Sequence, residues 1–169
     1  MRSLLIGAAV FIAMAIEAAR ASRNERTQRA RGGIEPPNDV YKMMRAVYPA
    51  AFCAMVAEGM WRGAPARAWF IGGALLFVAA KSLKWWAITA LGDFWTFRVI
   101  VVPGARLVRT GPYRVLRHPN YVAVAGELIA VALMTGALVS GPIATIAFGV
   151  LMLKRIAVEE RAIAQISNM

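Results

Sequence analysis

Long apolar runs, separated by short basic segments, dominate the pattern along the chain. About 20 consecutive apolar residues are needed for an α-helix to cross the hydrocarbon core of a bilayer. The runs predict five helical spans, at residues 3–21, 43–61, 68–92, 121–139 and 141–158. The second span is the weakest, because its uncharged core covers only residues 46–57.

The last two predicted spans form one uncharged stretch from Leu128 to Leu153. Ser140-Gly141-Pro142 interrupts it, and such a sequence breaks a helix. We therefore expect a tight helical hairpin within an all-α integral membrane protein, folded as a single domain over residues 1–169. The first run resembles a signal peptide, but Glu17 and the later apolar runs favour a first transmembrane helix.

Composition supports this membrane assignment and narrows the possible partners. The chain is 59% hydrophobic and 17% charged, which is too apolar for a soluble domain of this size. Its net charge of +11 is spread between apolar runs, so anionic lipid headgroups and an anionic ligand are favoured over nucleic acid. One cysteine and one histidine exclude an internal disulfide and leave too few ligands for a zinc site, so we expect no metal.

The distribution of basic residues predicts the orientation in the membrane. Five spans place 17 of the 20 lysines and arginines on one side. By the positive-inside rule, the N-terminus is then outside and the C-terminus is cytoplasmic. Residues 93–120 form a cytoplasmic loop in this arrangement, so a ligand of this loop is cytosolic.

The segment from Arg109 to Tyr121, RTGPYRVLRHPNY, concentrates the polar chemistry of the chain. Pro119 suits the first turn of a helix, which places His118 at the start of the fourth span, where free backbone N–H groups attract anions. Arg155 and Glu159 are four residues apart on one helical face and are expected at the same membrane depth. These groups are suited to a zwitterionic cofactor and an anionic substrate. Taken alone, the spacing of Arg155 and Glu159 favours an ordinary exposed ion pair of a helix. His118 is also compatible with a simple helix cap.

Three further charged residues lie inside predicted spans. Lys81 and Lys84 are one turn apart, and the pattern favours lysines that extend toward the membrane surface. Glu127 lies about two turns into the fourth span, where an ionisable group normally has a partner or a function. The sequence does not name that partner.

Gly111-Pro112-Tyr113, the motif from Arg117 to Tyr121, the apolar hairpin, and Arg155 with Glu159-Glu160 together resemble the C-terminal signature of the isoprenylcysteine carboxyl methyltransferase family. The resemblance covers residue 91 to the C-terminus. It implies S-adenosylmethionine at the cytoplasmic face and a lipid-like acceptor that enters from the bilayer, with Arg155 facing the acceptor. The cofactor residues that it implies are Ala105, Arg106, Leu107, Val108, Tyr113, His118, Pro119, Asn120, Tyr121 and Glu159. Arg98 stands where related enzymes carry glutamine, which leaves its role open.

The N-terminal half resembles a compact bacterial branch of this family, through Glu17, residues 22–25 and residues 31–35. That likeness implies a bacterial inner-membrane enzyme that O-methylates alkylpyrones or alkylresorcinols. Methyl transfer from a sulfonium depends mainly on holding the acceptor oxygen in line and excluding water. A carboxylate or an acidic hydroxypyrone needs no base, whereas a phenol with a pKa near ~10 needs one, for which His118 and Glu127 are candidates.

The expected function is therefore S-adenosylmethionine-dependent O-methylation of a lipidic acceptor. Three alternatives stay open. Phospholipid amine N-methyltransferases share a related C-terminal pattern, although an arginine facing the acceptor disfavours a cationic amine. Sterol reductases that use NADPH share the Arg-His-Pro-Asn-Tyr element but have more spans. A non-enzymatic scaffold for anionic lipid would bind through the basic loops in a salt-dependent way.

Overall fold

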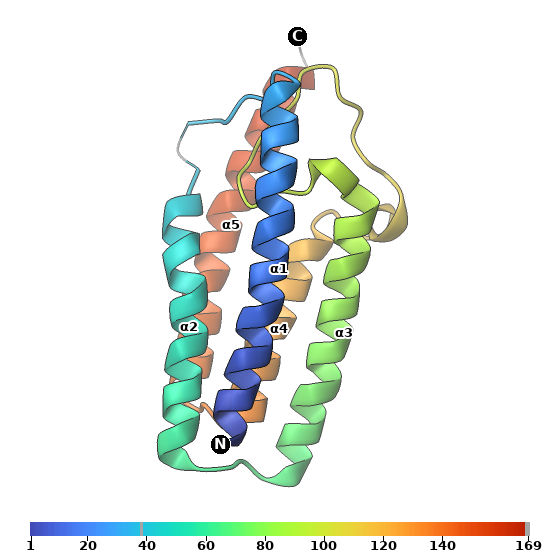
Figure 1. Cartoon of the computed structure of the whole chain (residues 1–169). Coiled ribbons are helices and arrows are strands. Elements are labelled where there is room, and N and C mark those ends of the chain that lie inside the picture. The colour runs from blue at the N-terminus through green and yellow to red at the C-terminus, as the bar shows by residue number, and fades with distance from the viewer. Residues whose placement is uncertain (38, 168–169) are drawn as a thin grey trace.

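The computed structural model is a bundle of five helices and describes residues 1–37 and 39–167. The long helices are α1 (Arg2–Ala30), α2 (Tyr41–Arg62), α3 (Arg67–Leu91), α4 (Pro119–Thr135) and α5 (Ser140–Ser167). Two short 3₁₀ turns, η1 (Gly92–Phe94) and η2 (Gly111–Arg114), lie between α3 and α4. Figure 1 shows the α1–α2 loop, the segment between α3 and α4 and the C-terminal part of α5 at one end of the bundle. This end carries the basic loops.

Three helical stretches are long and apolar enough to cross a membrane: Arg2–Ala30, Arg67–Phe94 and Ser140–Ala164. Helix α4 is equally apolar but has 17 residues, about 25 Å of helix at 1.5 Å per residue. Helix α2 has 22 residues but includes charged positions at both ends. The all-helical fold is thus as expected. Of the five expected spans, three are long and apolar enough to be assigned as membrane-crossing helices.

The turn between α4 and α5 lies earlier than the sequence pattern suggested. Helix α4 ends at Thr135 because Gly136 adopts a left-handed conformation (φ 72°), and the Ala137 N–H donates to the carbonyl of Ala132. Helix α5 begins at Ser140, so Ser140-Gly141-Pro142 forms its first turn, where proline is well tolerated. The expected break at these residues is therefore a helix start.

The first helix extends beyond the first predicted span, which ends at residue 21. Helix α1 continues to Ala30, and its last turns dock on the segment after α3. Asn24 Nδ2 donates to the carbonyls of Gly92 (3.0 Å) and Trp95 (2.8 Å), and Gln28 Nε2 donates to that of Asp93 (3.0 Å). These contacts fix the end of α1 against the region that joins α3 to α4.

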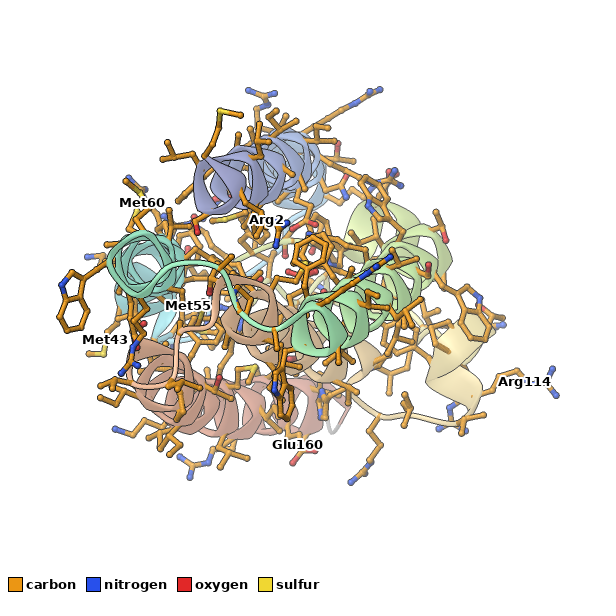
Figure 2. All side chains as sticks on the ribbon, turned by 90° about the horizontal axis from the view of Figure 1, so that it is seen from below. Arg2, Met43, Met55, Met60, Arg114 and Glu160 are labelled. Carbon is orange, nitrogen blue, oxygen red and sulfur yellow. The ribbon has the colours of Figure 1, made fainter. Side chains whose placement is uncertain are left out.

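The core contains large apolar side chains where α2, α4 and α5 meet. Phe52, Met55, Leu128 and Val131 are fully buried. Figure 2 shows Met55 inside the bundle and Met60, on the same helix, directed outward. Many outer side chains are large and apolar, including Leu75, Val78, Ile146 and Leu153, as expected for a surface in contact with lipid.

Helices α3 and α4 approach closely because a glycine lies between them. A Cβ atom at Gly73 would lie 2.8 Å from the carbonyl oxygen of Ala130. Small residues at such contacts let helix backbones pack tightly in membranes. This packing holds α3 and α4, which carry two of the buried charged residues described below, Lys84 and Glu127.

Candidate functional site

A cavity of about 1240 Å³ lies between the helices and the segment that joins α3 to α4. Ten of the eleven site residues predicted from the sequence line it: Ala105, Arg106, Leu107, Val108, Tyr113, His118, Asn120, Tyr121, Arg155 and Glu159. The eleventh, Pro119, is buried as the first residue of α4 and is not part of the wall. Residues far apart in the sequence thus share one cavity.

A hydrogen-bonded chain connects three of these residues. The Tyr121 hydroxyl donates to Glu159 Oε2 (3.1 Å) and accepts from Arg155 Nε (2.9 Å). Arg155 is buried, with 6% of its surface exposed. The tyrosine hydroxyl therefore lies between the guanidinium and the carboxylate, and the simple exposed pair of Arg155 with Glu159 is not what the structure has.

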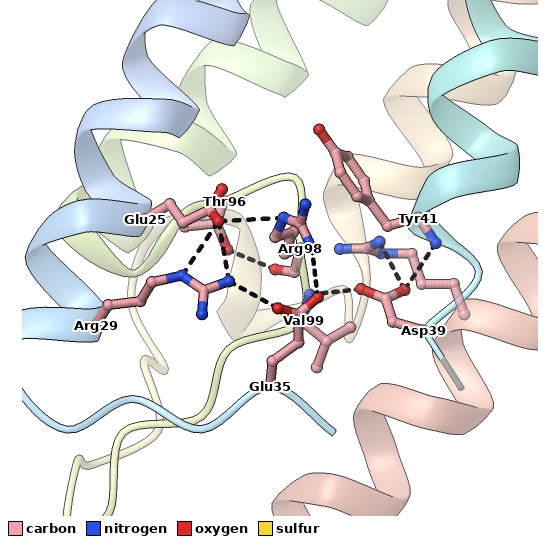
Figure 3. A network of polar contacts seen from close by, with 9 residues as sticks. Glu25, Arg29, Glu35, Asp39, Tyr41, Thr96, Arg98 and Val99 are labelled. Atoms are coloured by element: carbon pink, nitrogen blue, oxygen red, sulfur yellow. Dashed lines mark hydrogen bonds and ion pairs between the residues drawn. The ribbon is translucent and has the colours of Figure 1, made fainter. Parts of the chain in front are cut away.

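Asp39 completes this chain, although the sequence pattern did not single it out. Its Oδ1 accepts from Arg155 Nη1 (3.2 Å) and from the Tyr41 N–H (3.0 Å), and its Oδ2 accepts from the Val99 N–H (3.0 Å). Figure 3 shows Asp39 between Tyr41 and Val99. The loop before α2 therefore supplies a carboxylate to the site, and only its position directly before a helix could have drawn attention to it.

His118 and its neighbours form the part of the wall at the start of α4. His118 precedes the first helical residue, Pro119, as predicted. Its Nε2 lies 3.3 Å from Glu160 Oε1, and its ring centre lies 5.6 Å from that of Tyr121. Burial raises the pKa of the Tyr113 hydroxyl, and the charge of Glu159 adds to this effect.

Arg98, whose role the sequence left open, holds the α1–α2 loop to the segment after α3. Its Nη1 donates to Glu35 Oε1 (2.7 Å), its Nε lies 3.1 Å from Glu25 Oε1, and its guanidinium lies over the Tyr41 ring. Figure 3 shows this network. Burial alone would raise the pKa of Glu35, but hydrogen bonds from Arg29 and Arg98 outweigh it and lower that pKa.

The cavity also reaches a buried cluster of charges. Lys81 Nζ lies 2.7 Å from Glu17 Oε1 and 3.0 Å from Glu127 Oε1. Lys84 Nζ lies 2.6 Å from Glu17 Oε2 and 3.3 Å from Glu127 Oε2. The Tyr48 hydroxyl donates to Glu127 as well. Glu17, Lys84 and Tyr48 line the cavity.

These contacts correct the expectation for the two lysines. Lys84 is 2% exposed and does not extend to the membrane surface, because two carboxylates compensate its charge inside the bundle. They also name the missing partners of Glu127. The helices α1, α3 and α4 each supply part of the cluster, and the rotation of each helix about its axis decides which side chains meet. The spacing of residues along the sequence does not determine how each helix is rotated.

The fold and the cavity define a helical, membrane-type protein with a polar site at its basic end. Residues 73–165, more than half of the chain, match the model of the isoprenylcysteine carboxyl methyltransferase (ICMT) family. The chain belongs to this family, as the sequence resemblance implied, and membership implies a membrane methyltransferase.

The chain is also similar to the uncharacterized protein YpbQ of Bacillus subtilis (strain 168). The two are 30% identical over 163 residues, which cover 96% of this chain and 97% of the relative. A comparison with solved structures gave no match. The family match begins within α3, so Glu17 and Tyr48, which line the cavity, lie outside it. Asp39, which pairs with Arg155, also lies outside it.

Proposed function

We propose that the protein transfers the methyl group of S-adenosylmethionine to an oxygen atom of a lipid-like acceptor. One observation carries this proposal. In a chain of a methyltransferase family, a single cavity brings together the loop residues 105–108, the start of α4 and the Arg155–Tyr121–Glu159 chain.

The donor groups of the wall fit the chemistry of this cofactor. S-adenosylmethionine has a methionine ammonium and carboxylate, an adenosine and a sulfonium that supplies an activated methyl group. Among the described residues, no cation forms an ion pair with Glu159, so its carboxylate suits the ammonium. Residues 105–108 lie outside helices, and the Ala105 N–H donates to the carbonyl of Val102. The peptide N–H groups of residues 106–108 are the ones suited to a polar ligand. Tyr113, His118 and Asn120 would complete the cofactor site with ring and amide groups.

The remaining wall suits an amphiphilic acceptor. Met14, Met44, Val124 and Phe148 give the cavity an apolar side, where an alkyl chain would displace water. Arg155 and Tyr121 would orient the acceptor oxygen by hydrogen bonds. As the new bond from this oxygen to the methyl carbon forms, the sulfonium S–CH₃ bond would break and S-adenosylhomocysteine would leave. An acceptor hydroxyl would give its proton to His118, which lies in the same wall. Holding the acceptor in line and excluding water supply most of the rate enhancement for a displacement of this kind.

The proposed setting is a bacterial inner membrane, with the site at the cytoplasmic face. Support comes from the basic loops, which lie at the same end of the bundle as the cavity-lining segment 105–109. By the positive-inside rule, that end faces the cytoplasm, where the cofactor is available.

Transfer of a labelled methyl group tests the proposal. The purified protein would be incubated with methyl-labelled S-adenosylmethionine and three acceptors: a long-chain alkylphenol, a long-chain fatty acid and phosphatidylethanolamine. The proposal predicts that the wild type labels an oxygen acceptor and that Glu159→Ala does not. Asp93→Asn should keep the activity, because Asp93 pairs with Arg31 on the exposed surface. Label in phosphatidylethanolamine alone would instead support N-methylation. No label in any lipid, with salt-dependent lipid binding, would support a scaffold.

A further inference from the structure

The buried cations of the cavity wall are all compensated by carboxylates of the chain itself. Arg155 pairs with Asp39, and the two side chains are 7% and 4% exposed. Lys84 pairs with Glu17 and Glu127, and the half-buried Arg98 pairs with Glu25 and Glu35. The other arginines of the wall, at positions 45, 106, 109, 114 and 117, are exposed.

The compensation of a buried cation by a carboxylate of the chain has its largest consequence at Arg155. An unpaired, buried guanidinium would be a strong receptor for a carboxylate, because both groups would be removed from water. Asp39 already occupies one edge of that guanidinium, at 3.2 Å. A second carboxylate bound to the same guanidinium would lie about 6 Å from Asp39, and at an effective dielectric constant of ~20 that repulsion lowers affinity roughly tenfold to a hundredfold.

Asp39 also fixes the direction in which Arg155 points. Its two oxygens are held by the backbone N–H groups of Tyr41 and Val99, so the carboxylate is anchored at both sides. With Nη1 on this anchor and Nε on the Tyr121 hydroxyl, two edges of the guanidinium are fixed. The guanidinium then acts as an oriented hydrogen-bond donor that carries little free charge.

We infer that Asp39 is a positioning and specificity-determining residue, which makes Arg155 select an uncharged hydroxyl of an amphiphile over a carboxylate. The inference rests on the proposed function. It names the acceptor class by charge and assigns a role in the site to the α1–α2 loop, which lies outside the part of the chain matched by the family. Excluding a competitor by repulsion is a general route to specificity.

Binding measurements on protein saturated with S-adenosylhomocysteine test this inference without depending on turnover. The probes are a long-chain alkylphenol and a long-chain fatty acid with equal tails, at a pH where only the acid is ionised. We expect the wild type to bind the phenol more tightly. In Asp39→Asn, the ratio of the two dissociation constants should shift toward the acid by about tenfold or more.

Three further variants separate the effect of charge from that of loop structure. Asp39→Glu disturbs the loop but keeps the charge, and it should keep the wild-type ratio. Asp93→Asn removes an equal charge from an exposed pair and should also leave the ratio unchanged. If Asp39→Asn fails to bind S-adenosylhomocysteine, Asp39→Ser replaces it in the measurement. This variant also removes the charge, with a smaller side chain, and should show the same shift in the ratio of dissociation constants.

Tighter binding of the acid by the wild type would overturn the inference. So would equal shifts in Asp39→Asn and Asp39→Glu, because the effect would then come from loop structure. The proposed function fails separately, if the wild type neither binds S-adenosylhomocysteine nor transfers a methyl group to any of the lipids.

Discussion

Substitution of Lys84 by methionine should strongly destabilise the bundle. The ammonium is 2% exposed and lies between the carboxylates of Glu17 and Glu127, at 2.6 and 3.3 Å. Methionine has a similar length but no charge, so the two buried carboxylates would share only Lys81. Removing one partner of a buried ion pair typically costs about 3–5 kcal/mol, because the charge left behind stays buried.

The magnitude can be measured as a change in melting temperature. For a chain of this size, 1 kcal/mol corresponds to about 2–4 °C, so Lys84→Met should melt roughly 6–20 °C below the wild type. Thermal unfolding in detergent, followed by circular dichroism, would measure this difference. Lys154→Met is the matched control, because Lys154 is exposed on α5 and a surface change usually alters stability by less than about 0.5 kcal/mol.

A second substitution separates charge from packing in the same cluster. Adding Glu127→Gln to Lys84→Met restores the charge balance, with Lys81 facing Glu17 alone. We expect the double variant to recover part of the lost stability. Equal melting temperatures for Lys84→Met and Lys154→Met would refute the reasoning, and so would a further loss in the double variant.

Three other predictions concern packing, pH and the hydrogen-bonded chain. Gly73→Leu should cost about 1–3 kcal/mol in thermal unfolding, because its Cβ would meet the Ala130 carbonyl, whereas Gly72→Leu has open space and should cost little. The lowered pKa of Glu35 means that its pairing stabilises the fold above its ordinary pKa of 4.5 and is lost as pH falls through the lowered value. Amide hydrogen exchange of residues 31–35, corrected for intrinsic rates, should rise on this acidification and, at neutral pH, in Glu35→Gln. Unchanged exchange under both conditions would contradict the pairing of Glu35. Tyr121→Phe removes the hydroxyl between Arg155 and Glu159. The rate of methyl transfer should fall about tenfold, which corresponds to the loss of a hydrogen bond to a charged group. A rate equal to that of the wild type would argue against a role for these hydrogen bonds in the reaction.

The sequence predicted the helical architecture because membrane-length apolar runs and helix-start signals are local. Pro119 marked the start of α4, and the four-residue spacing placed Arg155 and Glu159 on one face of the last helix. The expected hairpin brought that face to the membrane depth of His118. The turn at Gly136 was missed, because the Ser140-Gly141-Pro142 motif is as compatible with a helix start as with a break.

Long-range pairing could not be predicted from local patterns. Asp39 and Arg155 are 116 positions apart, and neither residue indicates the other. The burial of Glu127 was a correct signal for a partner, but the partners themselves depend on how α1, α3 and α4 are rotated. Similarly, the first predicted span ends at residue 21, where the apolar run ends, whereas arginine is a good helix former and α1 continues to Ala30.

The most direct test of the central claim is a calorimetric titration of the detergent-purified protein with S-adenosylhomocysteine. Wild type and Asp93→Asn should show saturable binding, and Glu159→Ala should lose it while keeping the helical content of the wild type. No saturable heat from well-folded wild-type protein, or equal affinities in wild type and Glu159→Ala, would contradict the assignment of this cavity to the cofactor.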